Sequence, residues 1–188
     1  MKSSKRNDEG FTGLEAAIVL IAFVVVAAVF SYVVLGAGFF TTQKAQETVY
    51  KGVEQSTANI QMIGNVYGLS ANSNNATPTI TNITFVIGLA PGAPAMDLTK
   101  MKIVFSTPAT TPVILTQNTT ASTSAFTTKI GTNPVTAINA NDQVEIYFGV
   151  ADVGANTKMN IELRPSVGAA LPFSKTAPAT ITATNVLY

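Results

Sequence analysis

The side chains that most often carry enzyme chemistry are absent from this sequence. None of its 188 residues is a cysteine or a histidine. The chain therefore lacks a thiol nucleophile, an imidazole base and the commonest nitrogen ligand for metal ions. A hydroxyl nucleophile would need a lysine or a carboxylate as its base, and no paired-carboxylate motif or glycine-rich phosphate loop is visible. The sequence predicts no catalysis and no cofactor.

Three acidic residues lie close enough in the sequence to be considered as ligands for a calcium ion. Asp142, Glu145 and Asp152 could supply the carboxylate oxygens that Ca²⁺ prefers. Their spacing does not follow the EF-hand pattern, and solvated positions on a strand and its loops explain them equally well. We therefore predict no metal site.

Composition excludes further classes of partner. The 11 basic and 10 acidic residues give a net charge of +1, which does not favour nucleic acid or an acidic ligand. Charged residues make up 11% of the chain, against about 25% in ordinary soluble proteins. Thr, Ser and Asn, abundant after residue 70, must cover most of the surface. The length suits one domain with an appendage.

The first third of the chain predicts a very long helix. A charged segment, MKSSKRNDEG, precedes an apolar run in which Glu15 is the only charge between Phe11 and Gln43. Such a run is long enough to cross a membrane as a helix. Apolar residues at steps of three, four or seven continue to Tyr67, and Gly68 with the polar stretch at 70–75 supplies a stop signal. We expect one helix over 11–70.

The remainder of the chain has the pattern of β-structure. Apolar residues alternate with polar or smaller ones over 83–87, 101–105, 144–150 and 159–163, with weaker strands at 112–117, 123–130, 135–139 and 180–187. Proline and glycine separate these segments at intervals typical of a β-sandwich. The predicted fold class is α+β: a long N-terminal helix followed by an Ig-like antiparallel β-sandwich over 76–188.

The residues alone leave three interpretations of the apolar segment open. A secretory signal has an apolar stretch of about 7–15 residues, and this stretch is twice as long. A membrane anchor fits the length but explains neither Glu15 nor the amphipathic continuation. A helix stored in the membrane and then used for assembly explains both. Small residues, including Gly13, Ala16, Ala27 and Gly36, would let such helices pack closely.

The segment KRNDEG-FTGLE resembles the class III signal of type IV pilins and archaeal flagellins (archaellins). That resemblance implies a leader of residues 1–10, cleaved after Gly10, with Phe11 as the first residue of the processed chain. Glu15 then stands at the fifth position, where pilins carry a glutamate. The stretch at 36–61 is similar to archaellins in particular. The sequence departs from the usual archaeal leader at Asp8 and Glu9, where basic residues are normal.

The resemblance implies a structural subunit of the archaeal flagellum filament, polymerised through its N-terminal helix for swimming motility. The partners would be copies of the same chain, a prepilin-type signal peptidase, and a membrane assembly platform with its ATPase. The filament would be extracellular and the precursor membrane-inserted. Within the core, the new amino group of Phe11 could pair with a neighbouring subunit's Glu15. The alternatives are an archaeal adhesion pilin and a membrane-anchored surface protein, and an enzyme ranks last.

Three Asn-X-Thr sequons mark candidate sites for N-glycans on a secreted surface. They begin at Asn75, Asn82 and Asn118. Such triplets also arise by chance in a chain rich in Asn and Thr. Asn75 and Asn118 fall in expected loops, and we rank them above Asn82, which borders an expected strand.

Overall fold

The computed structural model describes the backbone of residues 5–188 and the side chains from residue 13 onward. Residues 1–4 of the predicted leader, and the side chain of Phe11, lie outside the described part. The chain divides into two compact units that meet between Lys51 and Gly52. Each unit is described by itself.

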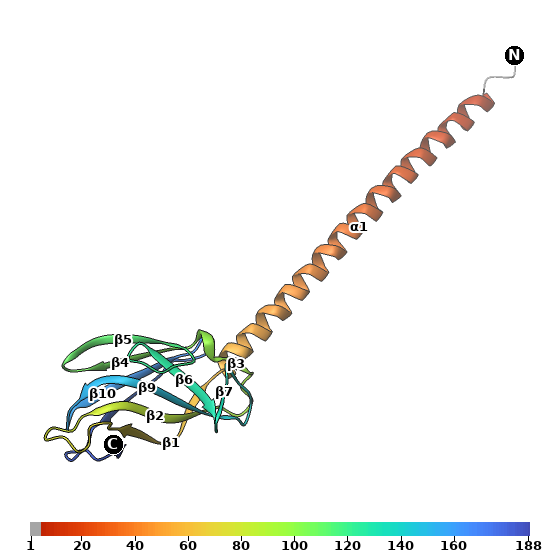
Figure 1. Cartoon of the computed structure of the whole chain (residues 1–188). Helices are drawn as coiled ribbons and strands as arrows, with labels where there is room; N and C mark the ends of the chain where they lie inside the picture. Colours follow the sequence, from red (N-terminus) through yellow and green to blue (C-terminus); the bar gives the residue numbers. More distant parts are fainter. Residues whose placement is uncertain (1–4) are drawn as a thin grey trace. The chain divides into compact units, whose positions relative to one another are not determined.

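A single helix, α1 (Lys5–Thr57), accounts for the first third of the chain (Figure 1). No proline interrupts these 53 residues, and the apolar side chains between Leu14 and Phe40 offer the backbone few competing polar partners. Residues just after α1 donate hydrogen bonds to carbonyl groups of its last turn. The backbone N–H of Ala58 donates to the carbonyl of Glu54 at 2.9 Å, and the Asn59 side chain donates to that of Ser56 at 3.1 Å. These bonds satisfy carbonyls that a helix end would otherwise leave unpaired.

The predicted helix over 11–70 is therefore too long at its C-terminal end. Residues 60–69 form strand β1 (Ile60–Leu69). Ile60 and Val66 point into the core of the β-domain, whereas Tyr67 points out. The helical spacing of Ile60, Ile63 and Tyr67 was misleading because pairing with two other strands outweighs local periodicity. The polar stretch at 70–75 connects β1 to the next strand instead of ending the helix.

Twelve strands follow α1, most of them antiparallel, as predicted. After β1 they are β2 (Ile80–Leu89), β3 (Met96–Asp97), β4 (Lys102–Thr107), β5 (Thr110–Gln117), β6 (Ala125–Ile130), β7 (Asn133–Pro134), β8 (Ala137–Ile138), β9 (Gln143–Val153), β10 (Lys158–Arg164), β11 (Leu171–Thr176) and β12 (Thr184–Leu187). The 3₁₀ turn η1 (Leu98–Lys100) precedes β4. The sequence missed β1, β3, β7 and β11, because their short or irregular apolar patterns lack a clear alternation.

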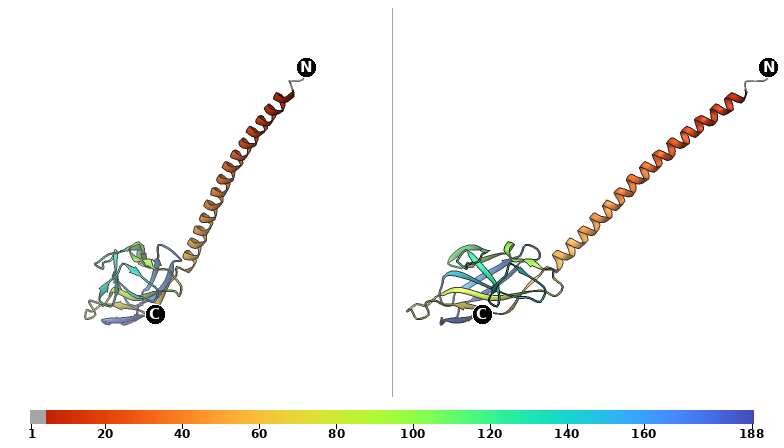
Figure 2. Two further views of the ribbon diagram at one scale, coloured as in Figure 1. Left: turned by 90° about the vertical axis from the view of Figure 1, so that its right-hand side faces the viewer. Right: turned by 45° about the vertical axis from the view of Figure 1, so that its right-hand side comes forward.

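One continuous sheet makes both layers of the β-domain. Its order is β11-β10-β4-β5-β6-β9-β2-β1-β12, with β7 beside β6, and the β5–β6 pair is parallel. The sheet curls until its ends nearly meet, since the backbones of Thr176 and Tyr188 exchange two hydrogen bonds. In the views of Figures 1 and 2, β4 and β5 lie along one side of the domain, and β1 and β2 lie along the other.

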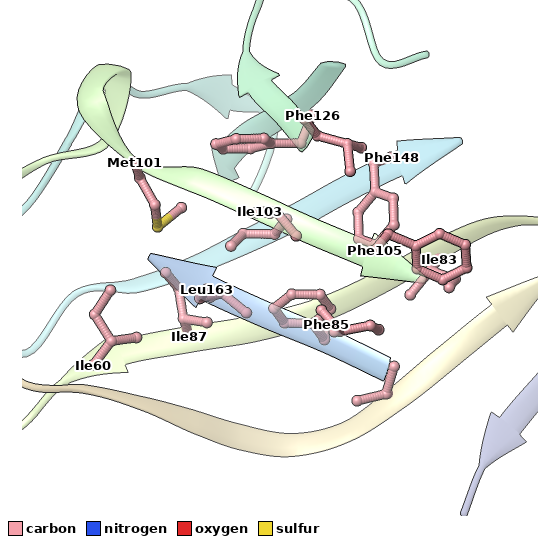
Figure 3. Packing of buried hydrophobic residues seen from close by; sticks show 14 of the residues in the cluster. Ile60, Ile83, Phe85, Ile87, Met101, Ile103, Phe105, Phe126, Phe148 and Leu163 are labelled. Atoms are coloured by element: carbon pink, nitrogen blue, oxygen red, sulfur yellow. The ribbon is translucent and has the colours of Figure 1, made fainter. Parts of the chain in front are cut away.

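The core fills the space between these two layers. Phe148 of β9 packs edge-on against Phe105 of β4, with ring centres 6.1 Å apart, and Phe85 of β2 packs against Phe173 of β11 at 5.4 Å. Figure 3 shows Phe85, Phe105 and Phe148 among the buried aliphatic side chains. Each strand predicted from alternation contributes its apolar side here, which is why those predictions are confirmed.

The backbone of Gly168 lies close to the backbone of Ala58, at the start of the β-domain. Gly168, in the loop between β10 and β11, has a φ of +95°, and a Cβ placed on it would overlap the carbonyl oxygen of Ala58. Ala58 itself is buried at 1% exposure. Only glycine fits this position, because it combines a left-handed backbone with contact to a second backbone segment.

Replacing Gly168 with alanine should therefore destabilise the domain more than the same change at Gly92. Gly92 also has positive φ (+81°), but nothing lies within 4 Å of the position that a Cβ would take there. Gly92→Ala should cost about 1–2 kcal/mol from backbone strain alone. Gly168→Ala should cost more than about 3 kcal/mol, because the loop must also move. Thermal unfolding of both full-length variants in detergent, followed by near-UV circular dichroism, measures the difference. Equal losses would contradict the close-contact explanation.

Candidate assembly site

The largest unpartnered surface of the chain is helix α1. Every residue from 13 to 56 is exposed, including seventeen large apolar side chains between Leu14 and Phe40. Its most apolar 18-residue window has a mean hydropathy of 3.0, enough by length and composition to cross a membrane. Burying one such side chain is worth about 1.5–3 kcal/mol. The total, on the order of tens of kcal/mol, exceeds the usual stability of a whole domain.

The apolar side chains surround α1 on all sides instead of forming one stripe. A helix of this kind belongs inside a membrane or inside other protein. Small residues leave a shallow groove on one side, which Ala27, Ser31 and Gly38 line together with Phe30 and Phe39. Such a groove lets the backbone of another helix approach closely.

Glu15 interrupts this apolar surface near the start of the helix. It is exposed on α1, four residues after Phe11. Gly10 and Phe11 also fall within the helix, so the predicted cleavage point lies in the backbone span of α1.

Polar groups return gradually after Phe40, and most are satisfied within the helix. The hydroxyl of Thr41 donates to the Ala37 carbonyl at 2.8 Å, and that of Thr42 donates to the Gly38 carbonyl at 2.9 Å. These bonds remove the penalty of burying a bare hydroxyl between helices. Further on, the ion pairs Lys44–Glu47 and Lys51–Glu47, both 2.7 Å, mark a solvent-compatible surface.

The three sequons lie in different environments within the β-domain. Asn75 is exposed in the connection between β1 and β2, and Asn118 is exposed just after β5. Asn82 lies within β2, where its amide donates to the Thr81 hydroxyl at 3.1 Å. The hydroxyl of Thr84, the third residue of that sequon, donates to Glu145 at 2.7 Å.

The acidic residues considered as calcium ligands are not brought together. The carboxylate of Asp142 accepts hydrogen bonds from Asn139, that of Glu145 from Thr84, and that of Asp152 from Thr79. Within the described residues no group of three acidic side chains could hold a metal ion. Each of the three carboxylates therefore has its own local hydrogen-bond partner.

Sequence reasoning missed exposed apolar residues on the β-domain because it assigned 60–69 to the helix. Tyr67 of β1 lies directly opposite Val186 of β12, and both side chains point to solvent. The inward positions Ile60, Met62 and Val66 were the signal for a strand, but the irregular step at Gly64 and Asn65 obscures their alternation.

Comparisons with known proteins identify the family of this chain. Residues 10–175 match the archaeal-type flagellin family. The chain is 37% identical to the probable flagellin 1 of Archaeoglobus fulgidus, over 97% of this chain and 96% of that protein. Among solved structures it is similar to the archaeal flagellum of Methanospirillum hungatei strain JF1, with 32% identity, a TM-score of 0.72, and coverage of 94% of this chain and 99% of that one.

A second structure supports the fold alone. The crystal structure of an archaeal flagellin from Methanocaldococcus jannaschii shares 14% identity with this chain, with a TM-score of 0.58 over 69% of this chain and 96% of that one. The long apolar helix, the mostly antiparallel β-domain and the match over nearly the whole length lead to one conclusion. The chain belongs to the archaeal-type flagellin family and is a structural subunit of the archaeal flagellum filament.

Proposed function

We propose that the chain polymerises by burying α1 among copies of the same helix, with the β-domains around this helical core. The observation that carries the proposal is the exposed apolar surface between Leu14 and Phe40, which no other part of the described chain covers. The membrane holds the helix before assembly, and neighbouring helices replace the lipid afterwards. The filament transmits torque through this core and performs no reaction of its own.

Processing and assembly require partners outside the chain. A prepilin-type signal peptidase cuts between Gly10 and Phe11, and a membrane platform with its ATPase moves the subunit into the filament. Removal of the leader discards Lys2, Lys5 and Arg6. These cations would be costly to bury in a core made of apolar helices.

Deletion of this chain should abolish swimming and remove its filaments from the cell surface. Swimming is measured on semi-solid medium, and filaments are counted by electron microscopy after shearing. The result separates the proposal from its alternatives. Loss of surface attachment with swimming intact would indicate an adhesion pilin, and a chain that never appears in sheared polymer would indicate an anchored surface protein. A parallel strain that carries the gene on a plasmid is the control.

Glu15 neutralises the new N-terminus in the proposed core. Cleavage leaves a positive amino group on Phe11, and a carboxylate from an adjacent subunit can pair with it. Each charge alone would be costly inside packed helices, and pairing offsets part of that cost. Removing one partner of a buried pair typically costs about 3–5 kcal/mol. The pair would also fix the axial register between neighbouring helices.

Glu15→Gln should therefore reduce filament yield strongly, because it keeps the shape of the side chain and removes its charge. N-terminal sequencing of sheared wild-type filaments should begin at Phe11. The matched control is Glu54→Gln, an exposed carboxylate near the other end of α1. Normal assembly of Glu15→Gln would refute the pairing, and filaments that begin at Met1 would refute the cleavage.

We also propose that Asn75 and Asn118 carry N-glycans, since both lie exposed outside regular strands. Peptides of purified filaments that contain either residue should show added sugar mass, which disappears in Asn75→Gln and Asn118→Gln. Asn82, held inside β2, should be unmodified and serves as the internal comparison. Unmodified peptides at all three sequons would rule out glycosylation of this chain.

A further inference from the structure

The β-domain keeps an apolar row exposed on the outward side of one layer. Val186, Tyr67, Thr84 and Tyr147 are direct cross-strand partners along β12, β1, β2 and β9, and they therefore point to the same side. Tyr67 is 37% exposed and Val186 is 49% exposed. A row of tyrosine and valine on the surface of a domain rich in Thr, Ser and Asn is typical of a contact surface.

The other layer has a comparable feature on its own outward side. Ile114 of β5, 54% exposed, lies opposite Val104 of β4, which is followed by Glu162 of β10 and Pro172 of β11. Beside this row is a shallow depression, lined by Val104 and Pro172 together with the small polar side chains of Ser106 and Asn160. The domain therefore has two outward surfaces that can each receive a partner.

Charged residues divide between these two surfaces. Asp142, Glu145 and Asp152 lie on β9 and the turn before it, with Lys129 of β6 beside Glu145. Three carboxylates and one ammonium give this "acidic face" a net charge of −2. The "basic face" comprises the outward charges of β4 and β10: Lys102, Lys158, Glu162 and Arg164. Three cations and one carboxylate give it a net charge of +2.

Neither face is fully compensated within one subunit. Lys102 lies directly opposite Arg164 in the β4–β10 ladder, an unfavourable juxtaposition of like charges. Glu162 accepts two hydrogen bonds of 2.9 Å from Arg164 and thereby offsets one of the two cations. The exposed carboxylate of Asp152 accepts a hydrogen bond from the neutral hydroxyl of Thr79. A carboxylate supplied by another molecule would compensate the positive charge that remains on the basic face.

The two faces belong to opposite sides of the domain. Phe148 of β9 meets Phe105 of β4 across the core, and Phe85 of β2 meets Phe173 of β11, so the outward sides of the two layers face away from each other. A contact between different faces of identical subunits does not close on itself, and it propagates as an open polymer. Opposite charge and exposed apolar rows on the two faces favour this head-to-tail arrangement over a symmetric dimer.

We propose that the acidic face of one subunit docks on the basic face of a second copy of this chain, joining the β-domains along the filament. The inference rests on the proposed function, since only a polymer brings copies into this register. The apolar rows supply buried contact area, with Tyr67 and Tyr147 against Ile114 and Val104 of the neighbour. Paired charges around them set the orientation.

The absence of cysteine from the sequence allows a direct test. Lys102→Cys and Asp152→Cys place one thiol on each face at exposed positions. Sheared filaments of the two single variants and of the double variant are treated with a short bifunctional maleimide and separated on a denaturing gel. The double variant should give about tenfold more cross-linked multimer than either single variant, in a ladder of increasing length, because only it has both thiols at each contact.

A control cysteine pair tests whether the cross-link is specific to the two faces, and its outcomes distinguish this inference from the proposed function. The pair Thr132→Cys and Asp152→Cys, with Thr132 exposed in a turn outside both faces, should stay at the level of the single variants. Filaments whose double variant yields only monomer, or whose single variants form dimers, overturn the face-to-face contact and leave polymerisation intact. If the unmodified chain forms no filament in cells, the proposed function itself fails.

Discussion

The apolar surface of helix α1 cannot remain in water, and the rest of the molecule follows from that constraint. Burial of the side chains between Leu14 and Phe40 is worth more than the stability of a typical domain. The chain must therefore occupy one of two environments, lipid or a bundle of like helices. Both satisfy the helix backbone internally and tolerate few charges, which explains why Glu15 stands alone in this segment.

The β-domain has a hydrophobic core of its own. Its core, centred on Phe85, Phe105 and Phe148, closes between two layers of its own sheet. A domain with an independent core can fold outside the membrane while the helix is still held in lipid. Its outer surface is poor in charge, so copies can be packed at high density without strong mutual repulsion.

Sequence reasoning succeeded where one local pattern had one physical meaning. The apolar run after Phe11 could only be a buried helix, and the alternation around Ile83, Ile146 and Ile161 could only be strands with one side in the core. It failed at Ile60–Leu69, because helical spacing and strand spacing fit the same residues and only the partners β2 and β12, distant in sequence, decide between them.

The candidate site also has one part that could be predicted from the sequence and one part that could not. Glu15 was recognisable because a lone charge in an apolar run is rare, whereas the surfaces of the β-domain were not. Which outward residues share a face depends on strand order, and the order β11-β10-β4-β5-β6-β9-β2-β1-β12 cannot be read from local patterns. Asp142, Glu145 and Asp152 are close in the sequence, but the structure gives each carboxylate its own hydrogen-bond partner, which spacing alone does not reveal.

The pairing of β1 with β12 also sets the timing of folding. Val66 and Leu187 are neighbours in the sheet, yet they lie near opposite ends of the domain's sequence. Sheets that depend on such distant contacts form slowly, because the loop entropy is lost before the contacts form. During that interval β1 has an open edge that could pair with another chain. A helix anchored in the membrane would keep newly exported chains apart and would give each domain time to close before subunits meet.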